Sequence, residues 1–127
     1  MPRSTSTTDQ APAPAGPYSQ HARIGSIVAA AGQAGFLPDG TLLKGVGEQT
    51  RQTLNNVLAV LAAGGAGEQD IISVRVFLTD VSQFEEMNAV YETVFSDPLP
   101  ARTTVYVSLP PGLDVEIDAL AVIGDAA

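Results

Sequence analysis

Arg102 is the residue whose type and position first point to chemistry. It is the one basic residue that follows Arg75, in a chain with a formal net charge of −8. Pro100 does not fit inside a central strand and therefore marks the point where a strand begins. A guanidinium at the start of a half-buried strand could hold a carboxylate by two parallel hydrogen bonds. The alternative is a surface arginine that pairs with a nearby acid, and this stretch alone favours that alternative.

Glu116 is the second candidate, because it opens the mixed face of a predicted strand over residues 115–123. Asp118 lies two residues further on and faces the same way. Two neighbouring carboxylates can raise each other's pKa, and a carboxylate in this position could take a proton from water. The alternative is that Glu116 is a solvent-exposed residue at the edge of the sheet, which is commoner for a glutamate in a strand. A metal site is not indicated, because two oxygen ligands on one strand do not define one.

Three other polar side chains have weaker patterns. Tyr18 follows Gly-Pro and could point into a cleft, although such a tyrosine is more often packed. Asn88 lies on the apolar face of a predicted helix, where a buried amide most often ties down a loop backbone. The single His21 cannot form a multi-histidine metal site, and the absence of cysteine excludes thiolate nucleophiles and disulfides.

Periodicity predicts the elements that position these side chains. Apolar alternation and turn residues predict strands over residues 18–24, 26–31, 70–79, 100–109 and 115–123, with a hairpin at Gly25 and a possible edge strand over residues 3–8. In the third of these strands Ile72, Val74, Val76 and Leu78 share one face. Spacing at i, i+3 and i+4 predicts helices over about 48–63 and from Phe84 past Phe95 to Asp97-Pro98. Two helices can cover one sheet face, so the pattern predicts a two-layer α+β fold.

The other sheet face is expected to remain uncovered. It would carry large apolar side chains mixed with charges, namely Phe77, Leu120 and Val122 with Arg75, Glu116 and Asp118. A partly apolar face of this kind tends to be an interface, so we expect a homo-oligomer. The alternative is a monomer with one solvated face.

Composition restricts the classes of protein. The 127 residues form one ordinary domain, residues 1–127, and 45% apolar content is enough to bury a core. The net charge of −8 repels nucleic acid and anionic lipid, so neither is an expected partner. No apolar stretch is long enough to cross a bilayer or to form an export signal, so we expect a soluble cytoplasmic protein.

Taken together, the segments resemble the RidA/YjgF family of enamine/imine deaminases. The matching stretches are 11–13 with 16–20, 31–33, 49–50 with 54–56, Phe84 with Asn88 and Tyr91, 99–102, and 115–119. They run in order and at the family's spacing from about residue 5 to residue 123. The resemblance implies a chorismate-mutase-like fold, a homotrimer with a cleft between subunits, and no cofactor or metal. It also implies hydrolysis of 2-imino or 2-enamino acids, such as 2-iminobutyrate or 2-aminoacrylate, to 2-keto acids and ammonia.

The resemblance also implies a role for each candidate. Arg102 would hold the substrate carboxylate, and Glu116 would position or deprotonate the attacking water. Tyr18 would line the cleft and hydrogen-bond to substrate or water, and Asn88 would support the surroundings of the arginine. This chemistry suits the residues, because an imine is already electrophilic and needs an anchor, a placed water and a proton route to the departing nitrogen.

Two positions depart from the family pattern and leave alternatives open. Ala31 stands where members often have Ser, and Thr104 where they often have Cys; with Arg102, Tyr18 and Asn88 they complete the predicted substrate contacts. The departures bear on substrate and rate, so a non-catalytic module that binds small carboxylates and a pathway-specific deaminase of a larger imine remain alternatives. A ribonuclease, an activity attached to relatives, is disfavoured by the negative charge.

Overall fold

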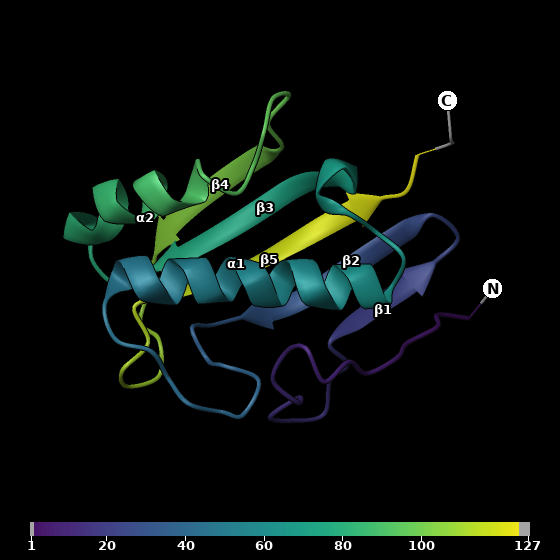
Figure 1. Cartoon of the computed structure of the whole chain (residues 1–127), viewed down its shortest axis with the longest axis horizontal. Helices are drawn as coiled ribbons and strands as arrows, with labels where there is room; N and C mark the ends of the chain where they lie inside the picture. The colour runs from purple at the N-terminus through teal and green to yellow at the C-terminus, as the bar shows by residue number, and fades with distance from the viewer. Residues whose placement is uncertain (1, 125–127) are drawn as a thin grey trace.

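Five strands form one mixed sheet, and two helices cover one of its faces (Figure 1). The computed structural model describes residues 2–124. Its elements are β1 (His21–Ile24), β2 (Ile27–Gln33), α1 (Val46–Ala63), η1 (Glu68–Asp70), β3 (Ile71–Leu78), η2 (Val81–Gln83), α2 (Phe84–Tyr91), β4 (Ala101–Tyr106) and β5 (Val115–Val122). The strand order is β1-β2-β5-β3-β4, and only the β3–β4 pair is parallel. The predicted two-layer α+β fold is confirmed.

The core lies between α1 and the sheet. Leu54, Val57 and Leu61, spaced at helical intervals, are at most 1% exposed and pack with the inward residues of β3 and β5. Each such side chain contributes about 1.5–3 kcal/mol by leaving water. The predicted hairpin is present: Ile24 pairs with Ile27, and Gly25 has the positive φ of 58° that its tight turn requires.

Three details of the predicted elements are wrong. Ile72 is 51% exposed, because a bulge between Ile71 and Ser73 turns Ile71 inward in its place. The second helix ends at Tyr91, well before Phe95; the Thr93 hydroxyl donates to the Val90 carbonyl (2.6 Å) where the helix stops. The possible edge strand at 3–8 is reduced to one antiparallel bridge between Ser4 and Arg23.

The register of β3, β4 and β5 decides which way the candidate residues face. Arg102 pairs with Val74, which pairs with Ala119, and both partners are buried beneath the helices. Glu116 pairs with Phe77 on the opposite, uncovered face. The predicted mixed apolar and charged face is therefore present, and we call it the open face. Among residues 2–124, no helix is long and apolar enough to cross a membrane.

Candidate functional site

Arg102 lies in a groove between the start of β4 and the helix α2. Its guanidinium carbon is 4.7 Å from the centre of the Tyr91 ring and 5.7 Å from the centre of the Phe84 ring. Within residues 2–124 the guanidinium makes no ion pair and no hydrogen bond. The interpretation as a surface arginine paired with an acid is therefore wrong. The hydrogen-bonding edges of the cation remain available to a ligand.

The groove has a volume of about 300 Å³ and combines the cation with mostly apolar walls. It is lined by Asn88, Tyr91, Glu92, Leu99, Pro100 and Arg102. The Asn88 side chain makes no hydrogen bond to another described residue, so the expectation that it ties down a loop is wrong. Thr104 shares the inner face of β4 with Arg102, and its Oγ1 is buried without a partner in the described part of the chain.

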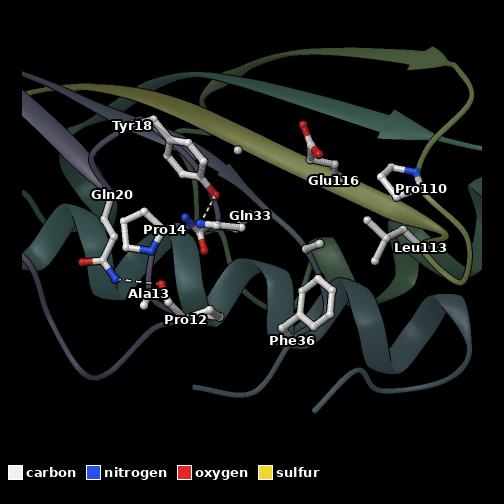
Figure 2. A pocket seen from close by; sticks show the side chains of 13 residues that line it. Pro12, Ala13, Pro14, Tyr18, Gln20, Gln33, Phe36, Pro110, Leu113 and Glu116 are labelled. Carbon is white, nitrogen blue, oxygen red and sulfur yellow. Dashed lines mark hydrogen bonds between the residues drawn. The ribbon is translucent and has the colours of Figure 1, made fainter. Parts of the chain in front are cut away.

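A second cavity, of about 340 Å³, lies where β2 and β5 meet the loops (Figure 2). We call it the Glu116 cavity. Its lining is Pro12, Ala13, Pro14, Ala15, Tyr18, Gln20, Gly32, Gln33, Ala34, Phe36, Pro110, Leu113 and Glu116. The Glu116 carboxylate points away from α1, toward the open face. Apolar and small residues thus surround one carboxylate and one phenol.

Burial raises the pKa of Glu116, and the charge of Asp118 raises it further. The predicted effect of the neighbouring carboxylate is present, but it is the smaller of the two causes. Asp118 is itself engaged, because Arg75 Nη2 and Nε donate to its two oxygens at 2.6 and 3.0 Å. The arginines of β3 and β4 differ accordingly: Arg75 is paired with an acid, and Arg102 has no acidic partner among the described residues.

Tyr18 is half exposed and stands at the edge of the Glu116 cavity. The Ala15 backbone N–H donates to its hydroxyl oxygen at 3.0 Å, as the dashed line in Figure 2 marks. The hydroxyl proton is therefore left to donate to a ligand or a water. Ala31 is close by, since it lines a shallow surface hollow together with Tyr18.

The candidates form two groups within one chain, and the chain does not bring the groups together. Arg102, Thr104 and Asn88 lie on the helix side of the sheet. Tyr18 and Glu116 line the other cavity, and β3 lies between β4 and β5. A small substrate cannot contact both Arg102 and Glu116 of the same chain.

Sequence reasoning missed residues that shape both groups. Tyr91 stacks on the guanidinium, and its spacing from Phe84 and Asn88 (i, i+4, i+7) was the available indication. Burial raises the pKa of Tyr91, and the Arg102 charge opposes that shift. Gly32 abuts Glu116 so closely that a Cβ there would lie 2.7 Å from Oε2. Among residues 2–124, no three acidic or histidine side chains gather to hold a metal ion.

Comparisons with known proteins agree along almost the whole chain. The profile of the family described as endoribonuclease L-PSP matches residues 8–123. A RutC family protein of Pyrococcus abyssi is 40% identical over 117 residues, covering 90% of this chain and 92% of that protein. A 2-iminobutanoate/2-iminopropanoate deaminase of Salmonella typhimurium is 40% identical over 123 residues, covering 93% and 96%.

Among solved structures, Escherichia coli TdcF with bound serine superposes with a TM-score of 0.91 at 36% identity, covering 95% of this chain and 98% of that one. The fold, the ordered motifs and these matches lead to one conclusion. The chain belongs to the endoribonuclease L-PSP family, which is the RidA/YjgF family that its motifs resemble.

Proposed function

We propose that the protein hydrolyses reactive 2-imino and 2-enamino acids to 2-keto acids and ammonia. The observation that carries the proposal is the Arg102 guanidinium, which has no acidic partner in the described chain despite a net charge of −8. A cation kept free in an acidic protein suits an anionic substrate, and its planar fork matches a carboxylate. The deaminase names of relatives about 40% identical support the same reaction class.

The site we propose is shared between two copies of the chain. Arg102 of one protomer would hold the substrate carboxylate, and Glu116 and Tyr18 of its neighbour would reach the imine carbon. The open face supports this arrangement, because Ile27, Val105 and Leu120 are 50%, 38% and 37% exposed there. We propose a homotrimer, which light scattering coupled to gel filtration tests; a monomer in solution would contradict it.

The reaction needs only a placed water and a proton relay. Glu116 would take a proton from water as its oxygen attacks the carbon of the C=N bond, and would return this proton to the nitrogen, giving a 2-amino-2-hydroxy acid. Glu116 would then take the proton of the new hydroxyl group and pass it to the amino nitrogen. Collapse of the intermediate forms the keto C=O bond, breaks the C–N bond and releases ammonia. Tyr18 would donate a hydrogen bond to the water or the substrate. The raised pKa of Glu116 suits a group that must both accept and return a proton.

The test is an imine-hydrolysis assay in which a dehydratase generates the imine in situ. The wild-type protein should accelerate release of keto acid and ammonia, and Arg102→Ala should abolish the acceleration while the oligomer stays folded. A matched control is Arg51→Ala, which removes an exposed arginine of α1 that lines neither cavity. Full activity in Arg102→Ala would refute the assigned anchor.

A second candidate is a non-catalytic module that binds small carboxylates. Ala31 favours it, because this position beside Tyr18 lacks a hydroxyl. The TdcF structure also carries a bound amino acid, serine. Binding of keto acids to the Arg102 groove with no turnover of any imine would select this candidate.

A further inference from the structure

Three carboxamide side chains that are at most 1% exposed have no role in the chemistry proposed above. Gln20 and Gln49 are 1% exposed and Asn56 is 0% exposed. Burying an amide is costly unless its groups are hydrogen-bonded, so each must have partners. We propose that these three amides are positioning residues that fix the walls of the Glu116 cavity, and thereby the size of substrate side chain that the site accepts. The inference rests on the proposed function, since it treats this cavity as part of the substrate site.

Gln49 holds the wall that leads into β5. Its Nε2 donates to the carbonyls of Leu43 and Gly112, both at 2.9 Å, and its Oε1 accepts from the Asp114 backbone N–H at 2.8 Å. The segment 110–114 supplies Pro110 and Leu113 to the cavity, and Glu116 follows two residues later. One side chain of α1 thus fixes both this wall and the entry of the strand that carries the carboxylate.

Asn56 holds the wall that follows β2. Its Nδ2 donates to the carbonyls of Ala34 at 3.1 Å and Phe36 at 2.8 Å, and both residues line the cavity. Its Oδ1 accepts from Gln52 Nε2 at 3.0 Å. Asn56 lies about two helical turns after Gln49, so both amides project from one face of α1. A single helix therefore sets the distance between two walls.

Gln20 holds the third wall, the proline-rich segment 12–15. Its Nε2 donates to the carbonyls of Pro12 at 2.8 Å and Thr8 at 3.1 Å, and its Oε1 accepts from the Thr8 N–H at 2.8 Å. Figure 2 marks the bond to Pro12. Apart from the Tyr18–Ala15 contact, the segment has no described hydrogen bond of its own to the sheet. Gln20 is thus its main fastening.

The walls carry no charge, so they discriminate by volume. The apolar and small members of the lining are Pro12, Ala13, Pro14, Ala15, Gly32, Ala34, Phe36, Pro110 and Leu113. A well-packed pocket distinguishes substrates that differ by one methylene by about tenfold or more. Without the hydrogen bonds from the amides, the wall segments could move outward. The discrimination between short and long substrate side chains would then fall.

The experiment compares short and long substrates in variants that replace an amide by an apolar group of similar size. The variants are Asn56→Leu, Gln49→Met and Gln20→Met, and Asn55→Leu is the matched control because Asn55 is the exposed neighbour of Asn56 on α1. Gln20→Met frees only the N-terminal segment, so it is expected to fold whatever happens to the α1 variants.

The readout is the ratio of kcat/KM for the imine of leucine to that for the imine of alanine, both made in situ by an amino-acid oxidase. We expect this ratio to change by about tenfold in the amide variants and to stay constant in Asn55→Leu. Equal losses on both substrates, with the ratio unchanged, would make the amides merely structural and overturn the proposal.

A binding measurement separates this inference from the proposed function. Calorimetry gives the ratio of affinities for 4-methyl-2-oxopentanoate and pyruvate, which needs no turnover. If the wild type hydrolyses no imine but the amide variants shift this affinity ratio, the deaminase proposal fails and the positioning proposal stands. If the wild type is active and neither ratio moves in the folded variants, the positioning proposal fails alone.

Discussion

The Arg102 groove and the Glu116 cavity are built in different ways. The groove consists of regular structure: β4 supplies the cation, and α2 supplies two rings that pack on it. The cavity is lined mainly by loops, which buried amides connect to α1 and to Gln20, the residue before β1. The groove provides a charge with little polar support, and the cavity provides a carboxylate in a desolvated space. In the function proposed above, each supplies one part of the site: the groove binds the carboxylate and the cavity supplies the base.

The largest expected effect comes from placing the Arg102 and Glu116 substitutions on different chains, which tests whether the groove and the cavity form one site. Arg102→Ala and Glu116→Gln should each be inactive alone, but co-refolded mixtures should recover about a quarter of wild-type activity. The recovery arises because about a quarter of the shared sites then take the intact Arg102 from one chain and the intact Glu116 from another. The measurement is imine hydrolysis after gel filtration of the mixed oligomer.

The control for this mixing experiment is the double variant Arg102→Ala/Glu116→Gln. Mixed with either single variant it leaves one of the two groups absent from every chain, so no activity should return. If a mixture that contains the double variant recovered as much activity as the mixture of the two single variants, Arg102 and Glu116 would not serve one shared site.

Replacement of the carboxylate alone should have the next largest effect. Glu116→Gln keeps the shape and removes the base, so kcat should fall by about 10²- to 10⁴-fold. Because the folded pKa of Glu116 is raised, the folded chain holds this proton more tightly than the unfolded chain. The ionised group therefore costs stability at neutral pH, and this cost is relieved as the pH falls through the folded pKa and below the unfolded one.

Thermal melts check the sign of this effect. The Tm of Glu116→Gln should equal or exceed that of the wild type near pH 8, and the difference should shrink toward about pH 4. A variant that is less stable than the wild type near pH 8 would mean that the carboxylate has a stabilising partner, contrary to its desolvated position.

Much of the fold was predictable because its determinants are local. Alternation over residues 100–109 and 115–123 predicted two strands, and Arg102 and Glu116 stood out by type. Local periodicity does not encode the pairing of distant strands, so it could not show that these two residues face opposite sides. The prediction for Ile72 was wrong for a related reason, because the bulge between Ile71 and Ser73 interrupts the alternation there, whereas Val74, Val76 and Leu78 face the core as predicted.

The role of the buried amides could not be predicted from local sequence patterns, for a different reason. Gln49 and Asn56 interrupt the apolar spacing of α1 and look like members of a solvated face. Their partners are backbone carbonyls of loops up to 63 residues away in the chain. Their role as hydrogen-bond donors that hold the loops in place is therefore visible only in the three-dimensional structure.

The contact between Gly32 and Glu116 offers a milder perturbation of the cavity. A Cβ at Gly32 would lie 2.7 Å from Oε2 and 3.1 Å from Cδ of Glu116, so Gly32→Ala must displace the carboxylate. The displaced atoms end a flexible side chain, and the Tm should therefore change little. Activity should fall by about tenfold to a hundredfold, because catalysis is sensitive to misplacement of about 1 Å.

Gly124→Ala is the matched control, since a Cβ there meets nothing within 4 Å. The same assay and melts apply to both variants. If Gly32→Ala keeps full activity, the position of the Glu116 carboxylate seen here is not the one used in the reaction.

Thr104 allows the smallest and most discriminating test on the groove side. Its Oγ1 is buried beside Arg102 without a described partner, a situation that costs free energy unless a ligand or water supplies the missing bond. Thr104→Val removes the hydroxyl and keeps the shape, so stability should be unchanged or raised by up to about 1 kcal/mol. Affinity for a keto acid should fall by roughly two- to tenfold, which calorimetry can resolve.

Thr103→Val provides the comparison, because Thr103 is exposed and faces the other side of β4. It should alter neither the melting temperature nor the affinity by a comparable amount. A lower Tm in Thr104→Val with unchanged affinity would make the hydroxyl part of the core. Higher stability with weaker binding would instead identify it as a ligand contact, because a group retained at a cost to the fold must act in the bound state.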